Sequence, residues 1–157
     1  MYKKIMKKLL LLGFIGLILI GCDNKKGAFL ETIDSQNSAS ATITKLIKTI
    51  EAEGLTYFET INHAKNAKDV GLRLTPKSVV VFGNPHLATA LMKCNPSIGL
   101  DLPLKILISS NYDGKTTLTY TNPEYWTLKH NIKDKKCLAI INKVSINMQK
   151  ITEKITK

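Results

Sequence analysis

Residues 78–85 read SVVVFGNP and decide how the middle of the chain folds. The first five residues carry no charge and have the length of one strand, which is typical of a buried strand. Asn84 followed by Pro85 is how a helix begins, because an amide side chain caps well and proline needs no amide hydrogen at the first helical position. We therefore expect a central strand over residues 78–82 and a helix over residues 87–94.

Upstream of this corner, two predicted strands flank a helix. Residues 28–33 and 55–61 mix threonine with large apolar residues, which favours strands. Between them, apolar residues repeat at helical spacing over residues 41–53, and Gly54 stands where a C-cap glycine is expected. The Ala-rich stretch 62–72 predicts one or two helical turns.

Downstream, the pattern predicts a hairpin and a short helix. Residues 102–109 and 115–121 form the two strands of the hairpin, because Asp113 and Gly114 supply its turn. Pro123 then opens a short helix that ends near residue 128.

The chain ends in a predicted basic amphipathic helix, over residues 133–157, with Asp134 as its N-cap. Apolar residues recur along it at helical spacing: Cys137, Ile141, Val144, Met148, Ile151 and Ile155. Four lysines stand seven apart on one stripe: Lys136, Lys143, Lys150 and Lys157. The stripe is either solvated beside a buried seam or in contact with anionic lipid, and the seam could also pair with a second copy as a homodimer. Together the elements predict an α+β fold with a single antiparallel-rich sheet and helices on one face.

The first residues have the layout of a bacterial lipoprotein signal peptide, over residues 1–21. Four lysines precede an uncharged stretch, from Leu9 to Ile20, that is too short to cross a bilayer. The four residues LIGC at 19–22 resemble a lipobox, which implies that Cys22 becomes an acylated N-terminus and that residues 22–27 form the tether. We expect a lipid-anchored protein on the cell membrane, facing the periplasm or the exterior, with Asp23 as a weak indication of the inner membrane.

The net charge of +11 is unevenly distributed along the chain. Residues 27–128 carry nine basic and nine acidic side chains, whereas residues 129–157 carry eight basic and two acidic ones. Arg73 is the single arginine, and aromatic residues are few. Export, the near absence of arginine and the shortage of stacking side chains all disfavour nucleic acid as a partner.

Several short motifs, in order, resemble a known bacterial family. They are INHA at 61–64, VGL at 70–72, FGNP at 82–85, GLDLPL at 99–104, the pair Asp113 and Gly114, and His130. Residues 28–132 are thereby identified as similar to the Domain of Unknown Function 302 (DUF302) family. The resemblance implies a compact α+β domain, often a dimer, with no assigned reaction. The chain departs from the family at Asn62, where Asp is usual, and at His86 and Ala88, where lysine and glycine are usual.

Four residues are candidates for ligand binding: His63, Asn84, Asp101 and His130. His63 at a strand end could be a general base or could cap the following turn. Asn84 could present its amide to a ligand, although capping already occupies it, and Asp101 fits ordinary turn chemistry. We expect a ligand- or partner-binding module. The alternative is an enzyme that uses His63 and Asp101 in a pocket near the FGNP corner.

No cofactor and no metal are expected, because no CxxC, HxxxH or HExxH spacing, phosphate loop or dinucleotide fingerprint is present. Cys94 and Cys137 remain after lipidation of Cys22, as an even pair in an oxidising compartment. They could form a disulfide between the helix after FGNP and the last helix. Their positions in the apolar register favour the alternative, two small buried thiols.

Overall fold

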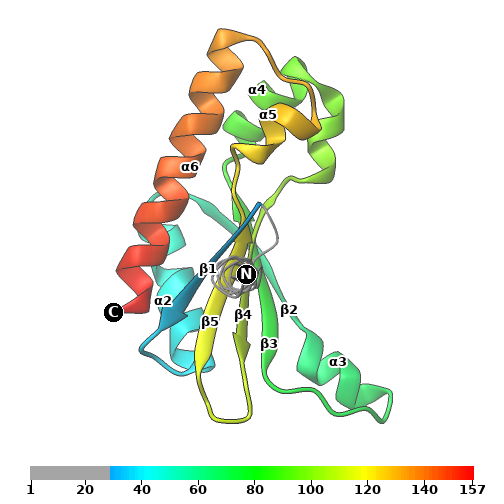
Figure 1. The fold of residues 1–157 in the computed structure, drawn as a ribbon, viewed down its shortest axis with the longest axis vertical. Coiled ribbons are helices and arrows are strands. Elements are labelled where there is room, and N and C mark those ends of the chain that lie inside the picture. The colour runs from blue at the N-terminus through cyan, green and yellow to red at the C-terminus, as the bar shows by residue number, and fades with distance from the viewer. Residues whose placement is uncertain (1–28) are drawn as a thin grey trace, which may run out of the picture.

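The computed structural model describes residues 29–157, which fold around a five-stranded antiparallel sheet (Figure 1). The strand order is β1-β5-β4-β3-β2. The strands are β1 (Leu30–Ser35), β2 (Thr56–Asn62), β3 (Lys77–Gly83), β4 (Leu104–Ser110) and β5 (Thr116–Thr121). The predicted α+β class with an antiparallel sheet is confirmed.

Each predicted helix is present, with ends shifted by a few residues at most. The helices are α2 (Ala39–Ala52), α3 (His63–Asp69), α4 (Pro85–Cys94), the 3-10 helix η1 (Pro96–Leu100), α5 (Tyr125–Lys129) and α6 (Lys135–Thr156). Gly54 follows α2 at φ 69° and Gly114 turns the β4–β5 hairpin at φ 80°, both in the left-handed region that glycine adopts without strain. The predicted helix end and hairpin turn are therefore confirmed.

Helices α2 and α6 pack side by side on one face of the sheet. The other face carries hydroxyl pairs, in which Thr32 meets Thr119 at 3.2 Å and Ser109 meets Thr117 at 2.9 Å. Hydroxyl-bearing side chains can be left in contact with water, so this part of the second face needs no covering helix. Val79, Val81 and Leu107 share the same face on β3 and β4.

β4, rather than β3, is the middle strand of the sheet. β4 lies between β3 and β5, whereas β3 lies one place from the edge strand β2. The expectation that residues 78–82 form the central strand is therefore wrong in position. An apolar run shows that a strand is buried, and it does not show how many strands lie on each side.

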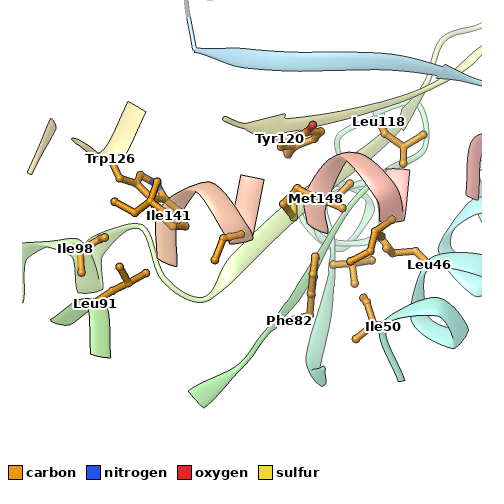
Figure 2. Packing of buried hydrophobic residues seen from close by; sticks show 14 of the residues in the cluster. Leu46, Ile50, Phe82, Leu91, Ile98, Leu118, Tyr120, Trp126, Ile141 and Met148 are labelled. Atoms are coloured by element: carbon orange, nitrogen blue, oxygen red, sulfur yellow. The ribbon is translucent and has the colours of Figure 1, made fainter. Parts of the chain in front are cut away.

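One hydrophobic core joins the sheet, α2 and α6. Figure 2 shows it extending from Leu46 and Ile50 at one end to Leu91, Ile98 and Trp126 at the other. The apolar seam predicted on α6 is buried in this core along its whole length, from Cys137 to Ile155. The chain's own sheet and α2 fill the seam, so a second copy would have to bind elsewhere.

Helices α4, η1 and α5 gather at one end of the sheet, and α3 lies near the opposite end (Figure 1). A disulfide joins Cys94 at the end of α4 to Cys137 in the first turn of α6, with 6.5 Å between their Cα atoms. Cys137 is buried as expected, whereas Cys94 is exposed. The cysteines thus tie the helical end of the molecule to the long helix.

Candidate functional site

The corner between β3 and α4 is held by Asn84. Its Oδ1 accepts hydrogen bonds from the amides of His86, at 3.0 Å, and Leu87, at 3.1 Å. Pro85 follows as the first helical residue. Asn84 is therefore the N-cap that the sequence predicts, and the cap sets the direction in which α4 leaves the sheet.

An apolar cavity of about 350 Å³ lies beside this corner. Its inner wall is buried, since Leu91, Met148 and Ile151 are at most 4% exposed. Its rim is open to solvent, with Phe58 47% and Met92 38% exposed. The lining comes from the ends of β2 and β3, from α4, from the segment before β4 and from α6: Leu55, Phe58, Gly83, Asn84, Pro85, Leu87, Ala88, Thr89, Leu91, Met92, Gly99, Leu102, Pro103, Leu104, Val144, Asn147, Met148 and Ile151. Such a size and lining are those of a site for a small ligand.

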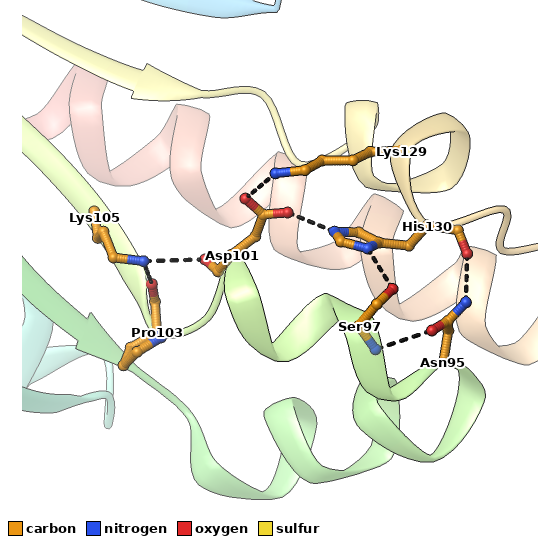
Figure 3. A network of polar contacts seen from close by, with 7 residues as sticks. All are labelled: Asn95, Ser97, Asp101, Pro103, Lys105, Lys129 and His130. Carbon is orange, nitrogen blue, oxygen red and sulfur yellow. Dashed lines mark hydrogen bonds and ion pairs between the residues drawn. The ribbon is translucent and has the colours of Figure 1, made fainter.

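A chain of hydrogen bonds joins η1 to the end of α5 (Figure 3). His130 Nε2 lies 2.5 Å from Asp101 Oδ2, and Lys129 Nζ donates to Asp101 Oδ1 at 2.8 Å. On the other side of the ring, His130 Nδ1 lies 2.7 Å from Ser97 Oγ. Asn95 Nδ2 donates to the backbone oxygen of His130 at 2.7 Å. The histidine is thereby held on both ring nitrogens and at its backbone.

The charges in this network favour an ionised Asp101. Burial by itself raises the pKa of the Asp101 carboxyl, but the hydrogen bonds from Lys129 and His130 and the charges of both outweigh it. The pKa of Asp101 therefore lies below its ordinary value of 3.8. The hydrogen bond to Asp101 in turn raises the pKa of Lys129 above its ordinary value.

The hydrogen bonds run from Ser97 through His130 to Asp101, which is the order of nucleophile, base and orienting carboxylate in a catalytic triad. A neutral imidazole that donates from Nε2 to Asp101 accepts the Ser97 hydroxyl proton on Nδ1. The Ser97 amide, however, already donates to Asn95 Oδ1 at 2.9 Å, so it does not serve an oxyanion. As it stands, the network fixes η1 against α5.

Within residues 29–157, no helix combines the length and apolar character needed to cross a bilayer. In the same part of the chain, no three His, Cys, Asp or Glu side chains gather as metal ligands would.

The profile of a family described as "Domain of unknown function DUF302" matches residues 31–155. The chain belongs to the DUF302 family. The match runs from β1 into the last turn of α6, so the C-terminal helix is included in the matched DUF302 region.

Two curated relatives contain a stretch similar to this DUF302 chain. They are "Fluoride-specific ion channel FluC 1" of Brucella suis biovar 1 and the protein of the same name from Brucella abortus biovar 1, each 34% identical over 103 residues. That stretch is 66% of this chain, 41% of the first relative and 38% of the second. The chain thus spans about two fifths of the length of these relatives.

A solved structure shares the fold. The crystal structure of an uncharacterized conserved DUF302 protein from Bacillus stearothermophilus superposes with a TM-score of 0.73 at 20% sequence identity. The superposition covers 82% of this chain and 99% of the other. The other chain therefore consists almost entirely of this one fold.

The DUF302 fold brings Asp101 and His130 together and keeps His63 apart from both. His63 begins α3 directly after the β2 residue that pairs with Ser78, whereas Asp101 precedes the β4 residue that pairs with Phe82. The two side chains therefore lie near opposite ends of β3. The pocket that the enzyme alternative requires, with His63 and Asp101 near FGNP, is not assembled.

The cap of α3 is Asn62 rather than His63. Asn62 Oδ1 accepts the amide of Lys65 at 2.8 Å, while His63 itself is exposed. Asn and Asp cap helices about equally well, so the Asp that is usual at this position in DUF302 chains would serve the same purpose.

Of two further features named from the sequence, one lies outside the described residues and the other lies within them. Cys22 and the whole of the predicted signal peptide lie outside the described residues. The four lysines of the stripe on α6 are all exposed, as either interpretation of the stripe requires.

Sequence reasoning missed Ser97, Trp126 and the inner wall of the cavity. One signal was available, because the dipeptide NP of the FGNP corner recurs at residues 95–96. Asn95 caps η1 as Asn84 caps α4, and it places Ser97 beside His130. Trp126 and the cavity wall had no such signal, since their side chains meet through the fold alone.

Proposed function

We propose that this protein is a lipid-anchored envelope lipoprotein whose DUF302 domain binds a small apolar ligand in the cavity beside Asn84. The observation that carries the ligand-binding part is the cavity itself. An open cavity of about 350 Å³ with a largely apolar lining has the size and character of a small-ligand site, and exposed apolar surface of this kind often marks a binding groove.

A fluorescent apolar probe tests the ligand site. N-phenyl-1-naphthylamine should gain fluorescence on binding to protein that begins at residue 23, because the naphthalene ring leaves water for the cavity. Ala88 lines the cavity and His86 on the same helix does not. Ala88→Phe should fill the cavity and abolish most of the signal, whereas His86→Phe should leave it unchanged. Equal signals from both variants would contradict the proposal.

The anchoring part is supported by the charged, apolar and LIGC segments of residues 1–22. Cells that make the full chain should yield a membrane-bound protein that incorporates labelled palmitate. Cys22→Ser should lose the label, and Cys94→Ser is the matched control. Palmitate on the Cys22→Ser chain would contradict acylation at this residue.

The Brucella relatives are named as fluoride channels, but only about two fifths of their length matches this chain. We therefore propose for this chain a function of the shared domain alone.

An acyl-transfer enzyme is the second candidate, and the contact between Ser97 and His130 at 2.7 Å is the observation that favours it. In this mechanism Ser97 Oγ attacks an ester carbonyl, its proton passes to His130 Nδ1, and the leaving alkoxide takes that proton. A fluorophosphonate probe should then label Ser97, and Ser97→Ala and His130→Gln should abolish the label. A folded wild-type protein that stays unlabelled eliminates this candidate.

A further inference from the structure

A second, smaller hollow of about 100 Å³ adjoins the apolar cavity. Leu104 and Met148 line both spaces, so the two share part of their walls. The six lining residues are Asp101, Leu104, Lys105, Thr121, Trp126 and Met148. The small hollow is thus a polar neighbour of an apolar site.

Lys105 brings an unmatched positive charge to the same hollow. Its Nζ donates to the backbone oxygens of Pro103, at 3.0 Å, and Asp101, at 3.4 Å, and no carboxylate of residues 29–157 pairs with it. The Asp101 carboxylate is already engaged by Lys129 and His130. The exposed Lys105 ammonium is therefore a charge of the hollow that no carboxylate of residues 29–157 pairs with.

We propose that the ligand is a medium-chain carboxylic acid, with its alkyl chain in the apolar cavity and its carboxylate beside Lys105. This inference rests on the proposed apolar ligand site. A cavity of about 150 Å³ holds a benzene ring, so the larger cavity has room for an alkyl chain of about ten carbons. A water molecule occupies about 30 Å³ in the liquid, so the small hollow suits the three heavy atoms of a carboxylate. The unbranched Met148 side chain can shift to join the two spaces.

The experiment compares decanoate with decanol as competitors of bound N-phenyl-1-naphthylamine, below the concentrations at which either aggregates. The two probes share an alkyl chain and differ in the charge of the head group. Protein from residue 23 onward retains every described element, and the Bacillus stearothermophilus chain shows that this fold stands without a further domain. Wild-type protein should release the dye at a decanoate concentration about tenfold below that of decanol.

Variants then locate the carboxylate. Lys105→Gln should shrink the preference for decanoate by about threefold or more, because it removes the cation. Lys93→Gln makes the same change in net charge at an exposed position outside both hollows and should leave the preference intact.

The outcomes separate this inference from the proposal on which it rests. Dye binding that Ala88→Phe abolishes, with equal potency of decanoate and decanol, overturns the carboxylate assignment and leaves the apolar site standing. A decanoate preference that survives Lys105→Gln also overturns it. Absence of dye binding to the folded protein overturns both.

Discussion

At the scale of single residues, Asp101 has the most varied set of contacts. Its two carboxylate oxygens meet Lys129 and His130, and its backbone oxygen meets Lys105. Sequence reasoning gave this residue either a turn role or a place in a site with His63, and it named His130 among the candidates for ligand binding. Their partnership depends on residues 29 apart in the chain, and no local pattern encodes it.

The lowered pKa of Asp101 predicts an acid-dependent contribution to stability. A carboxyl whose pKa falls on folding stabilises the native state above its unfolded pKa and loses this effect as the pH falls through the folded value. Asp101→Asn should therefore lower the free energy of unfolding by about 2 kcal/mol at pH 7, because it removes the charge that strengthens the hydrogen bonds to Lys129 and His130. The difference should vanish as the pH falls well below 3.8, in urea titrations at a series of pH values.

Asp113→Asn is the control, because it removes an exposed carboxylate from the β4–β5 turn. Its effect should stay within about 0.5 kcal/mol. A difference between Asp101→Asn and wild type that persists unchanged to pH 2.5, about one unit below the ordinary value, would contradict the assignment.

At the scale of elements, capping asparagines decide where three of the helices begin. Asn62, Asn84 and Asn95 each place a side-chain oxygen on the amides of the following turn. This chemistry is local, which is why the corner at Asn84 could be predicted from the letters NP alone. The role of Asn95 could have been predicted by the same rule.

Replacing the cap of α4 tests this view. Asn84→Ala should lower the free energy of unfolding by about 1 kcal/mol, whereas Asn84→Asp should be nearly neutral because Asp caps as well as Asn. Urea denaturation of both variants measures the two values. A larger loss in Asn84→Asp than in Asn84→Ala would show that the amide has a role beyond capping.

The disulfide links two elements, and its removal has a predictable direction. It closes a loop of 43 residues, so breaking it should cost about 2–4 kcal/mol through the entropy of the unfolded chain. The Cys94→Ser, Cys137→Ser double variant and the reduced wild type should show similar losses in thermal unfolding. A mobility shift between reducing and non-reducing gels checks that the bond is present, and two free thiols in freshly prepared protein would contradict it.

At the scale of the whole molecule, the excess charge is concentrated at the two ends of the chain. The part between residues 27 and 128 is neutral, and the long helix α6 presents its four-lysine stripe to solvent. If Cys22 anchors the chain, such a stripe could rest on the same anionic surface, at about 1 kcal/mol for each lysine near it.

Vesicle binding tests the stripe without the anchor. Protein from residue 23 onward should bind phosphatidylserine vesicles in low salt and release them in high salt, because the attraction is screened. Replacing the four stripe lysines with glutamine should abolish binding. The matched control replaces four exposed lysines elsewhere and should retain it: Lys65, Lys68, Lys93 and Lys115. Equal affinity for neutral vesicles would contradict the membrane interpretation.

The sequence by itself determined the elements of this protein and their class. Strand alternation, helix periodicity, the caps at Asn84 and Asp134 and the glycines at 54 and 114 act within a few residues, so they can be recognised without knowing the fold. Tertiary structure alone decided that β4 is central, that Cys94 meets Cys137 and that Asp101 pairs with His130 rather than with His63. It also made the cavity, whose wall combines residues from four separate stretches of the chain. The physical reason is that burial and pairing depend on which surfaces meet, and short-range patterns carry no information about contacts between distant parts of the chain.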